Sequence, residues 1–295
     1  MKDCANFWPK KPNDVSVRPD KPAWISLGLL LWTVTATAVP GDVYRWVDAE
    51  GRAHYADHPA RGAERMVLAP HPQPAYRVRR VYDGDTLQLE NGDKVRLLAI
   101  NTPEIESPRK SGEPGGEEAR LWLQNRLNGK SIRLEDDSEP RDHYGRRLAH
   151  VYTDDGEHIN VSLVRQGLAF VDIHPPNLRH TDRLLEAERE AWQAKRGLWQ
   201  LPEYAVVHDL NQVKGGILSR NWQRLAGTVE RIEDTRAYRS LILTGGFQAR
   251  IPRANLGLFP DPAGYLHKRV EIRGWVYRYR DQYAMQLRHP SAVRP

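Results

Sequence analysis

The chain has 295 residues, enough for two or three small domains, and a formal net charge of +6 at pH 7 with a pI of about 9.4. This basic balance favours a polyanionic partner, although a merely soluble basic protein would carry the same charge. The single cysteine, Cys4, excludes an internal disulfide framework.

Residues 1–38 have the order of a secretory signal. A polar segment with several lysines precedes the uncharged, mostly apolar run Ala23–Val34, and the small residues Ala36, Thr37 and Ala38 follow. The apolar run is too short to cross ~30 Å of hydrocarbon comfortably. We therefore expect cleavage after Ala38 and a periplasmic or secreted mature protein without a membrane span, with an uncleaved anchor as the alternative.

Residues 39–70 are expected to form a short β-hairpin module. Val43–Tyr55 alternates apolar and polar residues around a turn, and Gly51 can take the left-handed conformation that closes it. Two strands are marginal alone, so the hairpin should pack on something else. The segment resembles a YRWVD-type module found near the start of many bacterial envelope proteins, and Pro70–Pro74 follows as a linker.

The segment Val81–Glu104 reads as two strands joined by a tight turn. Leu87–Leu89 is strand-like, and the Asn-Gly-Asp sequence at 91–93 is a strong hairpin signal. We expect a second strand over Lys94–Ile100, ended before Pro103, which cannot donate to a β-ladder.

Two acidic residues stand beside this hairpin. Asp83 and Asp85 are two residues apart, so in extended chain they face the same way, and Gly84 between them permits a bulge. Two carboxylates held in this way, with further oxygen ligands from a neighbouring strand, suit a hard divalent cation. Taken alone, however, an Asp-Gly-Asp-Thr sequence is usually just a turn.

Five motifs in a fixed order change that interpretation: DGDT, RLLAINTPE, DHYGRRLAHVY, LVRQGLAFV and KRGLW. Together they resemble the thermonuclease (staphylococcal nuclease-like) family, from about Tyr76 to Trp199. The resemblance implies an OB-type five-stranded barrel with three helices, in a chain of α+β or mainly β class. It also implies Ca²⁺-dependent hydrolysis of DNA and RNA phosphodiesters with little sequence specificity, leaving 3′-phosphates.

The resemblance also implies a metal site. Asp85 would be a direct Ca²⁺ ligand, Asp83 an outer or water-mediated one, and Thr102 would offer its carbonyl oxygen. The remaining ligand position of the family, an aspartate, is Asn101 here. An amide oxygen can still coordinate Ca²⁺, but one negative charge is missing, so we expect weaker binding with activity retained.

The catalytic roles follow in the same way. Arg96 and Arg146 would grip phosphate, Glu104 would orient or deprotonate the attacking water, and Tyr144 matches the tyrosine next to the glycine of the YGR motif. The family's tyrosines that pack on the terminal nucleotide are not matched, because Asp172–Pro175 reads DIHP.

The periodicity of the remaining sequence agrees with a barrel covered by helices. Asn160 is the expected N-cap of the second helix, and Leu121 and Trp192 are expected to face inward on the first and third. We expect helices over Glu117–Asn128, Asn160–Phe170 and Thr181–Lys195, and further strands over Lys130–Glu135 and Leu148–Tyr152. The nuclease-like domain then spans 73–203.

Residues 218–295 are β-rich again and are expected to form a second, OB-like β domain. Aromatic residues and arginines alternate along it, which would make a stacking and phosphate-tracking surface for single strands, while an ordinary aromatic core is the alternative. The aromatic residues are Trp222, Phe247, Trp275, Tyr277, Tyr279 and Tyr283, and the arginines are Arg250, Arg273, Arg278, Arg280 and Arg288.

The leading hypothesis is therefore a monomeric nuclease that prefers single-stranded or locally open DNA and RNA. A second hypothesis is a catalytically inactive OB-fold envelope protein that binds nucleic acid or protein; Asn101 is the one residue in its favour, whereas Arg96, Glu104 and Arg146 argue against it. A third is a structural envelope protein whose hairpin and C-terminal barrel contact partners.

Overall fold

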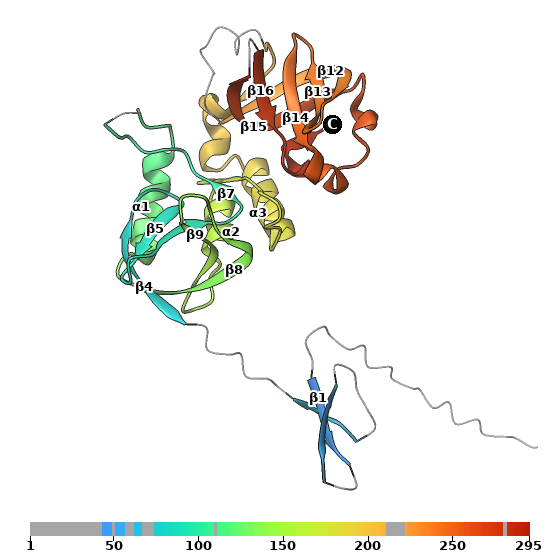
Figure 1. Cartoon of the computed structure of the whole chain (residues 1–295). Coiled ribbons are helices and arrows are strands. Elements are labelled where there is room, and N and C mark those ends of the chain that lie inside the picture. Colours follow the sequence, from blue (N-terminus) through green and yellow to red (C-terminus); the bar gives the residue numbers. More distant parts are fainter. Residues whose placement is uncertain are drawn as a thin grey trace, which may run out of the picture. The chain divides into compact units, whose positions relative to one another are not determined.

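The chain divides into two compact units, Met1–Pro70 and His71–Pro295, which are described separately below (Figure 1). The proposed signal segment, 1–38, lies outside the described residues, and no helix among the described residues is long and apolar enough to cross a bilayer. The computed structural model describes residues 43–48, 51–56, 62–66, 74–108, 111–210, 222–279 and 282–295.

The first unit contains the expected hairpin and one additional strand. β1 (Val43–Val47) pairs antiparallel with β2 (Ala53–Ala56), with Trp46 opposite His54. A third strand, β3 (Glu64–Met66), pairs with the other edge of β1. The alternation in the sequence did not indicate β3, because a strand of three residues is too short to show a period.

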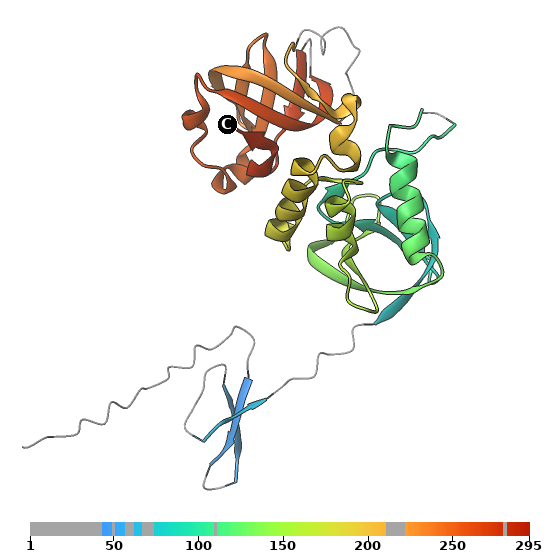
Figure 2. The same ribbon diagram turned by 180° about the vertical axis from the view of Figure 1, so that it is seen from behind.

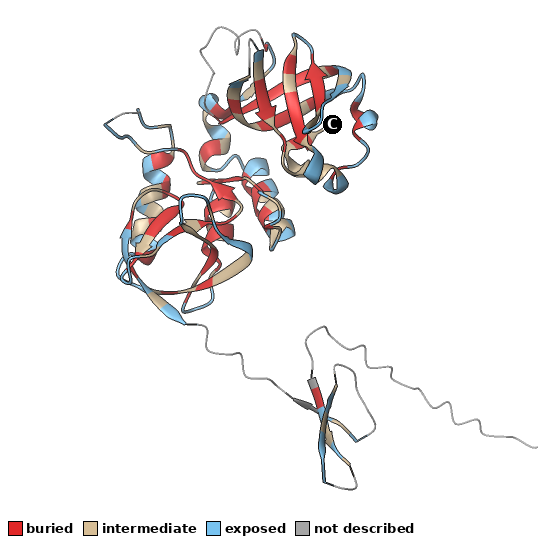
Figure 3. Cartoon of the chain, in the orientation of Figure 1, coloured by how far each residue is buried: buried red, intermediate tan, exposed pale blue. Residues whose placement is uncertain are grey.

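The second unit begins with a closed five-stranded barrel, which confirms the expected fold. Its strand order is β4-β5-β6-β9-β8, and the β6–β9 pair is parallel while the others are antiparallel. Alternate residues such as Leu87, Leu89, Val95 and Leu97 fill its interior (Figure 3). The strands are β4 (Ala75–Val81), β5 (Thr86–Leu89), β6 (Lys94–Leu97), β8 (Ser131–Arg141) and β9 (Arg147–Thr153).

The predicted strand Lys94–Ile100 is broken in two, contrary to expectation. β6 ends at Leu97, Ala99 takes a left-handed conformation with φ 59°, and β7 (Ile100–Asn101) follows. β7 leaves the barrel wall and pairs with β10 (Phe170–Val171). This turn directs Asn101 back towards the loop between β4 and β5.

Three helices accompany this barrel: α1 (Gly116–Leu127), α2 (Ile159–Arg165) and α3 (Thr181–Gln193). α1 lies along β4 and buries Ala119, Leu123 and Leu127 (Figure 2). Leu121 and Trp192 were expected to face inward, but both are exposed. Leu121 is two residues from Leu123, which places it about 200° away around the helix.

Asn160 has a different role from the predicted one. It lies within α2, whose N-cap is His158, and its side chain is fully buried. The Asn160 side chain accepts a hydrogen bond from the Val151 amide and donates one to the Leu98 carbonyl, both at 2.9 Å. It therefore ties strand β9 to the turn between β6 and β7.

The described residues of the expected β domain, 218–295, form a second strand-rich sheet, as expected, and a short strand before that range joins its edge. Five of its strands pair in the cycle β12-β13-β14-β16-β15 and back to β12, with β14 and β16 parallel, which is the connectivity of the first barrel. The strands are β11 (Val206–Val207), β12 (Trp222–Asp234), β13 (Tyr238–Leu243), β14 (Phe247–Pro252), β15 (Arg269–Tyr279), β16 (Gln282–Gln286) and β17 (Val293–Arg294).

Short 3₁₀ turns complete the second unit. Two connect α3 to the C-terminal sheet and three lie within the C-terminal barrel. They cover Gly197–Gln200, Pro202–Tyr204, Arg253–Leu258, Pro262–Tyr265 and Pro290–Ala292.

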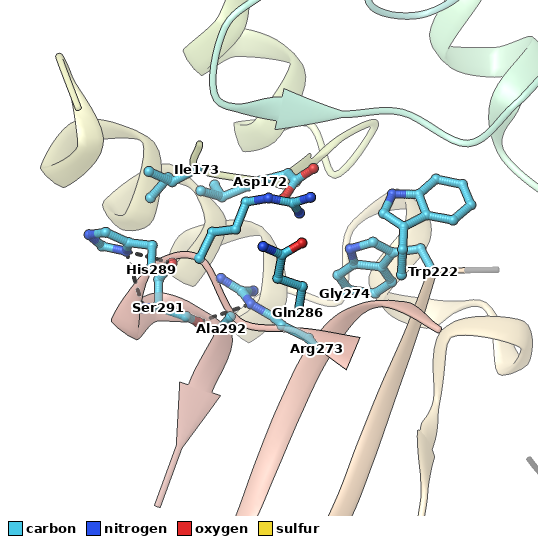
Figure 4. Close-up of a pocket in the computed structure, with 12 residues that line it drawn as sticks. Asp172, Ile173, Trp222, Arg273, Gly274, Gln286, His289, Ser291 and Ala292 are labelled. Atoms are coloured by element: carbon cyan, nitrogen blue, oxygen red, sulfur yellow. Dashed lines mark hydrogen bonds between the residues drawn. The ribbon is translucent and has the colours of Figure 1, made fainter. Parts of the chain in front are cut away.

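The two barrels share a closely packed seam. The Phe170 ring stacks on Trp222 with centroids 3.7 Å apart. Glu188 of α3 is fully buried and forms an ion pair with Arg273 of β15 at 2.5 Å. Figure 4 shows Asp172 and Ile173 facing Arg273 and its neighbours across this seam, where the crevice measures only about 20 Å³.

Several of the aromatic residues and arginines that were predicted to form a binding surface are buried. Phe247 belongs to the barrel core, and Trp222 is buried in the seam. Arg250 is buried between the rings of Tyr238 and Tyr279, 4.0 and 3.8 Å from their centroids. The alternating pattern thus mixes core, seam and surface positions; Arg280 lies outside the described residues.

Candidate active site

Asp85 is the centre of the predicted site. Its carboxylate is buried at the start of β5, where Thr86 Oγ1 donates to Oδ1 at 3.0 Å. Thr102, which follows β7, donates to Asp85 Oδ2 from its backbone amide at 3.0 Å and from its hydroxyl at 3.1 Å. The broken strand therefore brings the Asn-Thr-Pro-Glu segment onto the carboxylate of the Asp-Gly-Asp-Thr loop.

Gly84 serves a different purpose from the expected bulge. The register shift in the β4–β5 pair lies between Val78 and Arg80, not at Gly84. A Cβ at position 84 would lie 2.6 Å from the Cβ of Ala119 and 2.7 Å from the Thr102 side chain. Glycine is required here because the loop passes between helix α1 and Thr102.

Asp83 accepts a hydrogen bond from the Asp85 amide at 3.0 Å, so the two acids lie together in the loop. Burial and the neighbouring Asp85 carboxylate raise the pKa of Asp83 to about 7. A close carboxylate pair of this kind is destabilised by its own charge and gains from a nearby cation.

Arg96 joins the two halves of the site. Its Nη2 lies 3.0 Å from Asp85 Oδ2 and donates to Asn101 Oδ1 at 3.4 Å, while Nη1 donates to the Leu97 carbonyl at 2.7 Å. The Asn101 amide nitrogen in turn donates to the Thr102 carbonyl at 3.3 Å. An aspartate at position 101 could not make this last contact, because an ionised carboxylate has no donor.

The donor set fits a hard cation of the Ca²⁺ type, since every candidate ligand is an oxygen. The set consists of two carboxylates, Asp83 and Asp85, together with the amide oxygen of Asn101 and the carbonyl oxygen of Thr102. The described part of the chain contains no group of three or more His, Cys, Asp or Glu side chains that could hold a metal ion. With Asn101 in the third position, this site has only two acids.

Arg146 precedes β9 and is held by Asp142. Asp142 Oδ2 accepts from Arg146 Nε at 2.7 Å, and Oδ1 accepts from the Arg146 amide at 2.9 Å. Burial alone would raise the pKa of Asp142, but these bonds to Arg146 outweigh it and lower the pKa. Asp142 thus positions Arg146, a role that the sequence analysis missed although the residue stands in the DHYGRR motif.

The Tyr144 side chain is exposed, at 74%. The Arg146 guanidinium lies 5.5 Å from the centroid of the Tyr144 ring, and the ring also contacts His143. An exposed ring beside a phosphate-binding candidate is available to a ligand.

Glu104 is exposed, and hydrogen bonds from its backbone to Glu113 hold the segment in place. The Glu104 amide donates to Glu113 Oε2 at 3.0 Å, and its carbonyl accepts from the Glu113 amide at 2.7 Å. A Cβ at Gly116 would lie 2.6 Å from the Glu104 carbonyl oxygen, so the start of α1 packs directly on this segment.

A cleft of about 380 Å³ connects several of these residues. It is lined by Arg96, Asn101 and Arg146 from the predicted set, whereas Asp83, Asp85, Thr102, Glu104 and Tyr144 lie outside its lining. The far wall comes from the C-terminal barrel, through Trp275 and Arg288. No local signal in the sequence relates these two residues to the cleft, so they were not predicted to line it.

The cleft is also lined by Asp172, the first residue of the DIHP segment. Burial alone would raise the pKa of Asp172, but the charges of His174, Arg288 and Arg96 hold it at about 2. The carboxylate is therefore ionised at neutral pH, and its Oδ2 lies 3.0 Å from His174 Nε2.

Fold and site together define the class of protein: an OB-type barrel with an oxygen-rich candidate cation site and two arginines, Arg96 and Arg146, in an adjoining cleft. Comparison with known proteins agrees. A family model described as staphylococcal nuclease homologue matches residues 94–201, and a domain of unknown function (DUF4124) matches residues 30–80.

Two thermonucleases are among the relatives. That of Staphylococcus intermedius is 30% identical over 179 residues, 60% of this chain and 98% of the relative. That of Staphylococcus hyicus is 34% identical over 127 residues, 42% of this chain and 75% of the relative. Endonuclease YncB of Bacillus subtilis is 36% identical over 137 residues, 45% of this chain and 64% of the relative. The chain belongs to the staphylococcal nuclease family and is, in general class, a nuclease.

Proposed function

We propose that the protein hydrolyses DNA and RNA phosphodiesters in a Ca²⁺-dependent reaction with little sequence specificity, leaving 3′-phosphates. One observation carries the proposal: Arg96 links the carboxylate of Asp85 to the amide of Asn101 and lines the same cleft as Arg146. Membership of the family indicates a nuclease in general, and the chemistry of these residues supports a Ca²⁺-dependent reaction on phosphodiesters.

In this proposal Asp85, Asn101 and the Thr102 carbonyl, with Asp83 further out, would hold a Ca²⁺ ion, which would supply positive charge to neutralise the phosphate. Arg96 and Arg146 grip the phosphate oxygens, for which the planar guanidinium is suited. Glu104 orients or deprotonates the attacking water. The water oxygen bonds to phosphorus, the bond from phosphorus to the 5′ oxygen breaks, and a proton passes to that oxygen, which leaves the phosphate on the 3′ side.

The breadth of the substrate class follows from the same groups. Contacts to phosphate carry no base information, so two arginines and a cation act on any sequence. The net charge of +6 favours polyanions of either kind. We propose that a single strand, or a locally open duplex, is the preferred form.

Cellular location and assembly are part of the proposal as well. The order of residues 1–38, with a charged start, an apolar run and small residues, supports export and cleavage after Ala38. The mature chain would then act in the periplasm or outside the cell, as a monomer.

The test uses the chain from Val39 onward with single-stranded DNA and, separately, RNA, in Ca²⁺ or in EDTA. We expect cleavage in Ca²⁺ only, 3′-phosphate ends, and a loss of at least about a hundredfold in a Glu104→Gln variant, since a positioned general base contributes this much. Binding without cleavage at millimolar Ca²⁺, unchanged in the variant, would instead identify a nucleic-acid-binding barrel that has lost catalysis.

A further inference from the structure

The cleft beside the predicted catalytic residues has walls from two different barrels. Arg96, Asn101 and Arg146 line it on the side of the first barrel, and Trp275 and Arg288 line it on the side of the C-terminal barrel. Its volume of about 380 Å³ falls in the range of pockets that hold one small organic ligand. A single nucleotide fits a space of this size, whereas a duplex does not.

Trp275 is the only phenylalanine, tyrosine or tryptophan among the described residues that line this cleft. It is half-buried, so one part of the indole is packed and another is accessible. Aromatic rings bind unpaired bases by stacking, and this works for every base because each has a π-face.

The strand β15 holds Trp275 in a fixed position. Trp275 is directly opposite Trp222 in the β12–β15 pair, and Trp222 stacks on Phe170 of the first barrel. Arg273, two residues before Trp275 on the same strand, forms the buried ion pair with Glu188. Residues two apart on a strand share a face, so the contacts that join the barrels also aim Trp275 at the cleft.

Arg288 adds positive charge at the same wall. Together with Arg96 and Arg146 it gives the cleft three guanidinium groups, against the two carboxylates Asp142 and Asp172. Asp172 contacts His174 at 3.0 Å, and the charges of His174, Arg288 and Arg96 lower its pKa, so it stays ionised in the cleft. Arg96 is paired with Asp85 and Arg146 with Asp142, so Arg288 is the guanidinium group that the C-terminal barrel adds to the cleft. A guanidinium group beside an aromatic ring matches the phosphate and base of one nucleotide.

We infer that Trp275 and Arg288 of the C-terminal barrel form a nucleotide-binding subsite of the cleft. Trp275 stacks on one unpaired base of the substrate and Arg288 contacts its phosphate, so the second barrel completes the substrate groove of the first. The inference rests on the proposed function and goes beyond it, because it assigns substrate contacts to residues outside the region that matches the staphylococcal nuclease family.

The experiment measures binding and turnover separately in the full chain. In a Glu104→Gln background, fluorescence anisotropy follows a labelled single-stranded oligonucleotide of mixed sequence and the matching duplex, in Ca²⁺. The variants are Trp275→Leu, Trp275→Phe and Arg288→Ala. Arg231→Ala is the matched control, since Arg231 is an exposed arginine of the same barrel outside the cleft.

We expect Trp275→Leu to weaken single-strand binding about tenfold or more, the effect of losing one base stack. Arg288→Ala should weaken it by about the same factor, because it removes a charge-assisted phosphate contact. Trp275→Phe should keep binding within about threefold of the parent, because it retains a ring. Arg231→Ala should be unchanged. In the active enzyme, which retains Glu104, Trp275→Leu and Arg288→Ala should raise KM for the single strand and leave kcat nearly constant, because both residues act on substrate binding.

Unchanged anisotropy and KM in Trp275→Leu and Arg288→Ala, with cleavage intact, would overturn the subsite while the proposed nuclease function stands. Equal losses in Arg231→Ala would also overturn it, since they would indicate a general charge effect. If the parent enzyme cleaves nothing, the proposed function fails, and the anisotropy series still decides the subsite. Near-ultraviolet circular dichroism verifies that each variant is folded.

Discussion

At the scale of single residues, Asn101 distinguishes this site from one with three acids. Its amide oxygen accepts from Arg96 and its amide nitrogen donates to the Thr102 carbonyl. Two of the proposed ligand oxygens are thus engaged by neighbouring donors, and one negative charge is replaced by a neutral group. Both effects weaken the proposed site for a divalent cation.

Replacing Asn101 with aspartate should therefore strengthen Ca²⁺ binding. In Asn101→Asp we expect the Ca²⁺ concentration for half-maximal cleavage to fall about tenfold or more, because a charged ligand is added and the Thr102 carbonyl is released. Isothermal titration of Ca²⁺ into the protein provides a readout independent of turnover.

Asn91→Asp, in the exposed turn before β6, makes the same charge change outside the site and should leave the Ca²⁺ dependence unaltered. An Asn101→Asp protein with the Ca²⁺ affinity of the parent would show that position 101 contributes no ligand.

At the scale of elements, strand β9 and the N-caps of α2 and α3 each place one histidine in a cluster outside the cleft. His158 Nε2 lies 3.1 Å from His150 Nδ1, and the His158 ring stacks on Tyr152. Burial and the neighbouring imidazoles lower the pKa of His150 to about 4 and that of His158 to about 3. The cluster continues through His180 to Glu135 at 2.7 Å.

The pH dependence of stability follows from these pKa values. Both folded-state values are below the ordinary 6.5, so the unfolded chain takes up protons first as the pH falls. The two neutral histidines therefore contribute fully to the free energy of unfolding above about pH 6.5. This contribution is lost as the pH falls towards their folded-state pKa values of about 4 and 3. Burial would raise the pKa of Glu135, but hydrogen bonds from His180, Arg179 and Tyr152 lower it to about 2. The contribution of Glu135 to stability is therefore lost only below its ordinary pKa of 4.5.

Urea unfolding at pH 7 and pH 5 measures this effect. We expect the free energy of unfolding to fall less between pH 7 and pH 5 in His158→Phe than in the parent, because the variant keeps a ring against Tyr152 but cannot bind a proton. Asp83, whose pKa is raised to about 7, acts in the opposite direction over this range but is common to both proteins. His208→Phe, at an exposed position, should retain the full difference of the parent. Equal pH dependence in all three proteins would contradict the assignment to the buried pair.

At the scale of the whole second unit, the two barrels are joined by a small number of buried groups. Glu188 is the central one: its Oε1 accepts from the Val171 amide at 2.9 Å and its Oε2 pairs with Arg273, with Arg294 3.7 Å away. A buried charge that loses its partner is strongly destabilising, so this group should control the stability of the joined barrels.

Glu188→Ala should lower the free energy of unfolding by about 3–5 kcal/mol, because it leaves Arg273 buried and unpaired. Glu186→Ala is the control, since Glu186 is an exposed glutamate on the same helix whose pair with Arg189 lies at the surface. Chemical denaturation of both variants provides the comparison. Similar stability for the two would show that the seam contributes little to the fold.

Local patterns in the sequence predicted much of this protein. The first barrel and its helices followed from periodicity, turn residues and the ordered motifs, because these are properties of short segments. The interior positions of α1 that repeat every four residues, Ala119, Leu123 and Leu127, are buried as a helix requires. Leu121 was wrongly expected to be buried, because an apolar residue was counted without its angular position.

The tertiary structure alone decided how distant segments meet. The left-handed Ala99 breaks a predicted strand, and the chain after it brings Thr102 onto the Asp85 carboxylate. Asn160 ties a strand to a turn, and Trp275 reaches a cleft of another barrel. Such contacts depend on chain closure and on packing between elements far apart in sequence, for which no short segment carries a signal. The sequence by itself determined the chemistry that is available, and the fold determined which of those groups share one site.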